Sequence, residues 1–294
     1  MTLAPQFLKK GDKVILLSTA RKMSVEDIQT AKSLIESWGL QVELGETIGA
    51  EHHQYAGDDA LRLKDFQRAI DNDNIRAIFC ARGGYGTVRF LDQIDFSKFL
   101  RSPKWLVGFS DVTYLHTLIN HQLGIQTLHA SMPSLFSRTE DAAIQDIGKI
   151  LFGEEINYTI PAHPLNRGTE MIGETIGGNL SILYSITGTK SGFDTNGKIL
   201  FIEDLDEQLY HIDRMMINLK RSGKLDHLAG LLVGGFSAMH DNEIPFGKNA
   251  EEIILEHVAD KNYPVCFNFP AGHIRENYPL ILGRKTTIQI PHAG

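Results

Sequence analysis

Short apolar runs alternate with helix-length amphipathic stretches through the first half of this chain, and this alternation constrains the fold more than any other feature. The apolar runs are typical of buried strands; they are KVILLS, QVELG, IRAIFCA and WLVGFS. Between the first two runs, in 25–39, apolar residues recur at helical spacing and Gly39 follows as a helix C-cap does. Strands separated by helices predict βα units on a mainly parallel sheet.

The pattern changes between residues 131 and 171, where prolines and mixed polar residues surround one short helical stretch. We place the crossing between two domains there. The predicted division is an N-terminal α/β domain over 1–135, an inter-domain linker over 136–170 and a smaller C-terminal domain over 171–294. The last run, PLILGRKTTIQI, alternates Thr and Ile as an antiparallel strand does, so the second domain is expected to hold a mixed sheet.

Composition and charge exclude several classes of protein. The 294 residues are 42% hydrophobic and carry a net charge of -7, without a basic stretch suited to nucleic acid. No apolar run approaches the ~20 residues that span a bilayer, and the N-terminal stretch lacks the apolar core of a secretory leader. Cys80 and Cys266 lie far apart, which fits a reducing compartment. The expectation is a cytoplasmic protein with neither a nucleic-acid nor a membrane partner.

A glycine cluster, CARGGYGTVR, follows the strand-like run IRAIF. Glycines after a strand often begin a phosphate site. The dinucleotide fingerprint fails here, because Gly84 and Gly86 are followed by Arg89 at the place of the third glycine. No Gly-Lys-Ser/Thr phosphate loop is present either. The cluster therefore predicts a bend with exposed backbone amides.

Ser110 follows the strand KWLVGF and precedes a helical pattern, so it lies at a strand-to-helix turn. Such a turn exposes a hydroxyl above the sheet edge, as a nucleophile elbow does. The match is partial, since Val112 stands where the elbow motif has its second glycine. The alternative is that Ser110 or Asp111 only caps the helix.

A nucleophilic serine needs a base and a group that orients it. His273 lies in the Pro/Gly loop FNFPAGHIREN and is the candidate base; a surface histidine is the alternative. The run ILFIEDLDE offers four carboxylates, of which Glu203 ends the apolar run directly and is favoured over the three that follow: Asp204, Asp206 and Glu207. Carboxylates at this place are often helix caps or solvated charges.

The glycine bend is a candidate oxyanion site. Preorganised N–H donors stabilise the anion that forms when a serine attacks a carbonyl. Loops after neighbouring parallel strands lie at the same sheet edge, so the bend and Ser110 are close if their strands pair. The expected donors are the backbone N–H of Asp111 and an amide of the Gly83, Gly84 pair, with the choice between these glycines open.

In order and spacing, five motifs resemble the LD-carboxypeptidase family of serine peptidases over nearly the whole chain; they are RGGYGTVRFLDQIDF, WLVGFSDVT, GGNLSIL, FIEDLDEQLYHIDRMM with LLVGGF, and FPAGH. The resemblance implies an N-terminal α/β domain like class I glutamine amidotransferases and a swivelling β/β/α C-terminal domain. It implies Ser110 as nucleophile, Glu203 as the orienting carboxylate and His273 as general base and acid. The implied reaction releases the terminal D-alanine of a murein tetrapeptide through an acyl-enzyme, without metal or organic cofactor. A homodimer is also implied.

Two stretches depart from the family pattern: LLSTAR replaces an Ala-Pro-Ser turn, and HASMP replaces His-Gly-Pro-Met. Both departures concern substrate details. The free carboxylate of the substrate calls for a cation, and Arg82 or Arg89 is the candidate. The alternative for Arg89 is a structural ion pair with a carboxylate such as Asp92 or Asp95. The adjacent pair His52 and His53 is interpreted as surface residues, because adjacent histidines rarely face one metal.

Two other functions fit the same motifs. A peptidase of the microcin-immunity type keeps the triad and cleaves peptidyl-aminoacyl nucleotides; such proteins usually carry a longer loop with an aromatic residue. A non-catalytic α/β module that holds a peptide or sugar in the inter-domain cleft belongs to another class. Hydrolysis of a murein tetrapeptide, with Ser110→Ala in parallel, tests these functions: hydrolysis retained by the variant contradicts the nucleophile assignment, and no hydrolysis by either protein favours the binding module.

Overall fold

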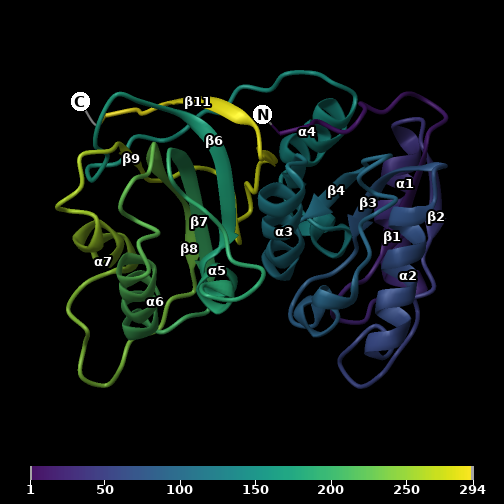
Figure 1. Ribbon diagram of the computed structural model, residues 1–294, viewed down its shortest axis with the longest axis horizontal. Helices are drawn as coiled ribbons and strands as arrows, with labels where there is room; N and C mark the ends of the chain where they lie inside the picture. The colour runs from purple at the N-terminus through teal and green to yellow at the C-terminus, as the bar shows by residue number, and fades with distance from the viewer. Residues whose placement is uncertain (1, 293–294) are drawn as a thin grey trace.

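A computed structural model describes residues 2–292 as two lobes, each built on one sheet (Figure 1). The first sheet has the strand order β10-β5-β4-β3-β1-β2, and the second has the order β11-β6-β7-β8-β9. No helix in this described part of the chain is long and apolar enough to cross a membrane. The structure is therefore a two-domain α/β fold, as expected.

The first sheet is parallel over five of its strands, which confirms the βα prediction. Its strands are β1 Lys13–Leu17, β2 Gln41–Leu44, β3 Ile75–Cys80, β4 Trp105–Gly108, β5 Thr127–His129 and the antiparallel β10 Leu280–Leu282. Its helices are α1 Val25–Ser37, α2 Asp59–Asp71, α3 Thr113–Leu123 and α4 Asp141–Leu151. Short 3-10 helices cover Thr87–Arg89, Leu91–Gln93, Ser110–Val112 and Pro133–Arg138.

Local sequence explains where α1 begins and ends. Ser24 caps its start by accepting a hydrogen bond from Asp27 N at 3.0 Å. Gly39 follows its end with φ +88°, a left-handed conformation that suits glycine, and its N–H bonds the carbonyl of Glu36. The predicted helix and its glycine cap are confirmed.

The second sheet is mixed. Its strands are β6 Glu170–Asn179, β7 Lys198–Leu205, β8 Gly230–Ser237, β9 Val265–Cys266 and β11 Lys285–Gln289. Its helices are α5 Leu180–Ile186, α6 Leu209–Arg221 and α7 Ala250–His257. The terminal strand β11 pairs antiparallel with β6, which confirms the prediction from its Thr/Ile alternation.

Two elements bear on the predicted domain limits, which stay a prediction. The helix α4 lies within the range expected as a linker and buries Ile144, Ile147 and Leu151 in the core of the first lobe. The strand β10 lies within the range expected for the second domain but pairs with β5 of the first sheet. The edge strand of the first sheet therefore comes from the C-terminal part of the chain.

One apolar core runs through both lobes. It joins Leu115 and Ile119 of α3 to Ile176 of β6 and Leu183 of α5, all of them buried. Figure 1 shows α3 at the boundary, beside β6 and α5. Burial of each such side chain contributes about 1.5–3 kcal/mol, so this core holds the lobes in a fixed relation.

The close approach of the two lobes depends on glycine in β6. Gly178 has φ +139°, and a Cβ at this position would lie 2.5 Å from Thr113 Oγ1 at the start of α3. A side chain would thus push α3 away from β6. The next residue, Asn179, bonds Thr113 Oγ1 through its backbone N–H at 3.1 Å and lies opposite Glu203 of β7. This close contact brings the Ser110 turn near the carboxyl end of β7.

Candidate functional site

Ser110 occupies a strained turn directly after β4. Its φ is +61°, a left-handed conformation that is costly for a residue with a side chain. The 3-10 helix Ser110–Val112 and then α3 follow at once. A half-buried hydroxyl on such a strand-to-helix turn matches the elbow geometry that the sequence predicted only in part.

The glycine bend lies against Ser110. The strands β3 and β4 pair in parallel, so the loops after them share one sheet edge. A Cβ added at Gly83 would lie 3.5 Å from Ser110 Cβ and 3.0 Å from Met132 Cε. The predicted neighbourhood of bend and serine is therefore confirmed.

Two buried charged residues hold the bend in place. Asp111 accepts a hydrogen bond from Thr87 N at 3.0 Å, and burial raises the pKa of its carboxyl. Arg62 of α2 donates to the carbonyls of Gly86 at 2.8 Å and Thr19 at 2.9 Å. Sequence reasoning missed Arg62, because a buried arginine in an amphipathic helix has no local signal.

Glu203 and His273 form a tight pair. Oε2 of Glu203 accepts a hydrogen bond from His273 Nδ1 at 2.6 Å and another from the backbone N–H of His273 at 3.1 Å. Burial alone would raise the pKa of Glu203, but the charge and hydrogen bond of His273 hold this pKa below its usual value. Burial alone would lower the pKa of His273, but Glu203 raises this pKa above its usual value. The pair is a carboxylate that orients an imidazole.

The other three carboxylates of the run have different partners. Asp204 accepts from Asn179 Nδ2 and from Ser181 N and Oγ, each at 2.9 Å. Asp206 bonds His240 Nε2 at 2.6 Å, and Glu207 bonds His211 Nδ1 at 2.6 Å. Glu203 is thus the member that reaches His273.

Phe109 connects the serine turn to the imidazole. Its ring centroid lies 4.6 Å from that of His273, and Ser110 is the next residue in the chain. No hydrogen bond joins Ser110 to His273 within residues 2–292, and catalytic hydrogen bonds are often long without substrate. The structure brings a hydroxyl, a carboxylate–imidazole pair and a glycine bend to one place, which are the groups that nucleophilic acyl transfer uses.

A buried asparagine that the sequence analysis missed fixes the His273 loop. Oδ1 of Asn277 accepts from Gly272 N at 2.9 Å, and its Nδ2 donates to Ser131 Oγ at 3.1 Å. Ser131 follows β5 of the first sheet. Asn277 therefore ties the loop of the candidate base to the other lobe.

The candidate cations for a substrate carboxylate both have partners in the structure. Arg89 Nε bonds both carboxylate oxygens of Asp59, at 2.8 and 3.0 Å; its partner is thus Asp59 rather than Asp92 or Asp95. Arg82 is exposed, and its Nη1 donates to the carbonyl of Lys22 at 3.0 Å. Arg82 has no acidic partner within residues 2–292 and stays the freer of the two candidates.

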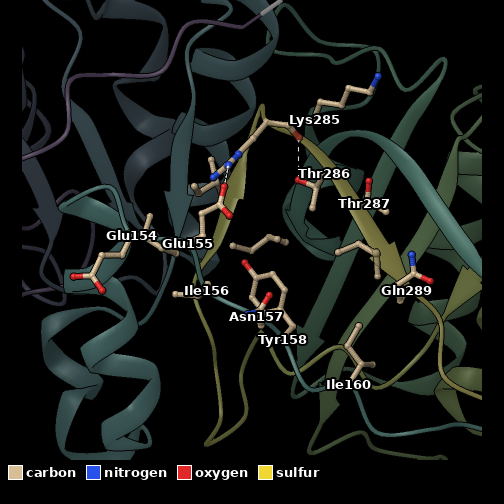
Figure 2. A pocket seen from close by; sticks show the side chains of 15 residues that line it. Glu154, Glu155, Ile156, Asn157, Tyr158, Ile160, Lys285, Thr286, Thr287 and Gln289 are labelled. Carbon is tan, nitrogen blue, oxygen red and sulfur yellow. Dashed lines mark hydrogen bonds and ion pairs between the residues drawn. The ribbon is translucent and has the colours of Figure 1, made fainter.

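A groove of about 560 Å³ lies elsewhere, between the segment 154–160 and β10 and β11. Figure 2 shows Tyr158 and Ile160 on one wall and Thr287 and Gln289 on the other. None of the three candidate triad residues lines this groove. It is therefore separate from the site at Ser110.

Comparison with known proteins agrees with the fold and shows the family. The model of the LD-carboxypeptidase N-terminal domain matches residues 13–130, and that of the LD-carboxypeptidase C-terminal domain matches residues 172–288. The chain belongs to the LD-carboxypeptidase family and is a peptidase.

The similar proteins carry names consistent with this family. A "Probable murein peptide carboxypeptidase" of Bacillus subtilis is 36% identical, over 97% of this chain and 91% of that protein. The "Murein tetrapeptide carboxypeptidase" of Pseudomonas aeruginosa is 27% identical, over 94% of this chain and 93% of that protein.

Solved structures share the fold. A muramoyltetrapeptide carboxypeptidase from Oxalobacter formigenes has a TM-score of 0.84 at 24% identity, with 95% of each chain covered. The microcin C7 self-immunity protein MccF, in complex with aspartyl sulfamoyl adenosine, has a TM-score of 0.87 at 20% identity, with 98% of this chain and 96% of that chain covered. At these identities the likeness concerns the fold.

Proposed function

We propose that this chain is a serine-type LD-carboxypeptidase that releases the terminal D-alanine from murein tetrapeptides, with Ser110 as nucleophile and Glu203 and His273 as its partners. The observation that carries the proposal is the Glu203–His273 pair, 2.6 Å long, beside the strained Ser110 turn. The names of the relatives from Bacillus subtilis and Pseudomonas aeruginosa support the murein substrate.

The proposed mechanism assigns one role to each of these groups. His273 takes the proton of Ser110, and the serine oxygen attacks the carbonyl carbon that precedes D-alanine. The oxygen of that carbonyl becomes an anion, which the N–H of Asp111 and an amide of Gly83 or Gly84 stabilise. The protonated His273 then gives its proton to the departing amine, which leaves an ester on Ser110. Water, deprotonated by His273, hydrolyses this ester and restores the free serine.

Release of D-alanine leaves a murein tripeptide, and we place the reaction in cell-wall peptide recycling. The cytoplasmic location and the homodimer stay predictions from the sequence and from the family resemblance. Arg82 is the proposed partner of the substrate carboxylate, since a guanidinium binds carboxylates through paired hydrogen bonds.

The experiment compares wild-type protein with Ser110→Ala on a murein tetrapeptide and measures released D-alanine. The expected result is release by the wild type and a loss of at least 10⁴-fold in the variant, because a triad without its nucleophile keeps only background catalysis. Ser37→Ala, on the exposed face of α1, is the matched control and should retain full activity. Hydrolysis retained by Ser110→Ala would contradict the nucleophile assignment.

A peptidyl-aminoacyl nucleotide, assayed in parallel, separates the two peptidase functions. Faster cleavage of the nucleotide than of the tetrapeptide would favour the immunity type. Tight binding of the tetrapeptide without hydrolysis by the wild type would favour a binding module.

A further inference from the structure

A second buried histidine lies beside the candidate triad. His129 ends β5, opposite Gly108 of β4, and is fully buried. Its ring packs edge-to-face on Phe201 at 5.0 Å and on Phe109 at 5.5 Å between centroids. Phe109 is the same ring that contacts His273. Neither ring nitrogen of His129 has a hydrogen-bond partner within residues 2–292.

Glu203 has a matching unpaired atom. Its Oε2 takes both hydrogen bonds from His273, whereas its buried Oε1 has no partner in the described part of the chain. Glu203 lies two residues after Phe201 in β7, at an irregularity in the pairing of β7 with β8. The ring of His129 packs on Phe201, and its interaction with the charge of Glu203 shows that the two side chains are close.

The other polar groups around His129 are already engaged. His116 bonds Thr127 Oγ1 and the carbonyl of Gly108, each at 2.8 Å. The carboxamide of Asn277 is a second candidate partner of the ring, and it also bonds Gly272 N and Ser131 Oγ. Asp204 is bonded to Asn179 and Ser181. Among the acceptors near this imidazole, Oε1 of Glu203 is the buried one that has no hydrogen bond at all in the described part of the chain.

The neutral form of His129 can donate one hydrogen bond. Burial lowers the pKa of His129 to about 4, and the charge of Glu203 only partly opposes this effect. The imidazole is therefore neutral at pH 7, with one N–H to donate. A buried donor or acceptor left unpaired destabilises the folded state, so pairing the two atoms removes two such penalties.

We propose that His129 is a positioning residue whose neutral imidazole donates an N–H to Oε1 of Glu203, directly or through one bridging water. Glu203 is then held between two histidines, with Oε2 on His273 and Oε1 on His129. The second donor stabilises the negative charge of the Glu203–His273 pair and fixes the plane of the carboxylate. This inference deepens the proposed function and rests on it for its catalytic meaning.

The direct test is an NMR titration of His273 in three proteins: wild type, His129→Phe and His129→Gln. The Phe variant keeps a planar ring but has no donor, whereas the Gln variant keeps an N–H. Without the donor the negative pair is less stable and takes up a proton at higher pH, so the His273 titration should move up by about one pH unit in His129→Phe. It should return to near the wild-type midpoint in His129→Gln.

Kinetics on the tetrapeptide give the second readout. In His129→Phe the acid limb of kcat should move up with the titration, and kcat at pH 7 should fall about tenfold with little change in KM. A purely structural role for His129 would lower the thermal midpoint and leave the limb in place. An unshifted His273 titration in a folded His129→Phe protein, or a shift that Gln does not reverse, overturns the proposal.

A third variant, Glu203→Gln, leaves His129 unchanged, so its result does not depend on whether a substitution at position 129 folds. In Glu203→Gln, the ring ¹⁵N–H resonance of His129 should move, because its acceptor has changed from a carboxylate to an amide. An unmoved resonance overturns the proposal. If His129→Phe shifts the His273 titration but the wild type hydrolyses no tetrapeptide, the proposed function alone is contradicted. If the wild type hydrolyses the tetrapeptide but His129→Phe shows no shift, this inference alone is contradicted.

Discussion

Oε2 of Glu203 accepts two hydrogen bonds from one residue, His273: from Nδ1 at 2.6 Å and from the backbone N–H at 3.1 Å. A carboxylate only accepts, so Nδ1 carries the proton and Nε2 is the free base. The backbone bond fixes the loop, and the Nδ1 bond fixes the ring. One side chain thus determines both where the imidazole lies and which nitrogen accepts a proton.

Loss of this carboxylate should disable the enzyme without unfolding it. In Glu203→Gln the amide has a similar shape but no charge, and it can favour the wrong tautomer of His273. We expect kcat to fall about 10⁴-fold, as when a triad carboxylate becomes an amide. D-alanine release and circular dichroism measure the two effects. Asp213→Asn is the matched control, because Asp213 pairs with His257 Nε2 at 2.7 Å on α6 and α7. A Glu203→Gln enzyme within tenfold of wild type would contradict the assignment.

The raised pKa of His273 predicts the pH dependence of the reaction. The base must be neutral to accept the proton of Ser110, and Glu203 moves the titration of His273 above the usual 6.5. The acid limb of kcat/KM should therefore have its midpoint above pH 6.5, with activity that rises toward alkaline pH. A profile measured from pH 5 to 9 tests this. A midpoint below 6 would show that Glu203 does not act on the base as the structure indicates.

Gly272 should tolerate no side chain. Its φ is +114°, and an added Cβ would lie 2.8 Å from Glu203 Cβ and 2.9 Å from Glu203 Oε2. We expect Gly272→Ala to displace the His273 loop and to lower D-alanine release at least tenfold. Gly247→Ala is the control for backbone strain alone, since Gly247 has φ +86° and nothing within 4 Å of the added Cβ. The control should lose about 1 kcal/mol of stability and keep its activity. Equal activity of the two variants would contradict this reading of the loop.

Buried neutral histidines predict a loss of stability in acid. Burial lowers the pKa of His116 to about 3. Between pH 6.5 and 3 the unfolded chain takes up a proton at this residue and the folded chain does not. The free energy of unfolding therefore falls with falling pH, by about 1.4 kcal/mol per pH unit for this group. Urea unfolding at pH 7 and pH 5 should show a smaller pH effect in His116→Gln than in the wild type. Equal effects would mean that His116 titrates normally.

Thiol reagents should leave the folded enzyme unmodified. Burial raises the pKa of Cys80 and Cys266 to about 12, so neither forms the reactive thiolate near neutral pH. Incubation with iodoacetamide should leave both the mass of the protein and D-alanine release unchanged. Labelling in 6 M urea is the control that both thiols react once exposed. Rapid labelling of the native protein would contradict the buried placement.

Candidate residues near the carboxyl ends of strands were predictable, because local periodicity locates the apolar run. Ser110, just after β4, and Glu203, in the last part of β7, were proposed in this way, and the closeness of the glycine bend to Ser110 followed from the parallel pairing of β3 with β4. The same local signals predicted α1 and the antiparallel β11.

Contacts between distant segments were not predictable in this way. The short run of β10 has no local mark that assigns it to the first sheet rather than the second. His129 opens the HASMP stretch, which the sequence analysis related to substrate details, and Asn277 lies in no such motif; the buried contacts of both are with residues from other segments. Arg89 pairs with Asp59, 30 positions away in the chain. The alternative drawn from the sequence had considered only acids close to Arg89 in the chain.

The edge strand β10 makes each half of the chain depend on the other. A fragment of residues 1–170 would have a first sheet without its last strand. The complementary fragment would have a strand without a sheet to join, so the two halves are expected to fold as one unit around Ser110.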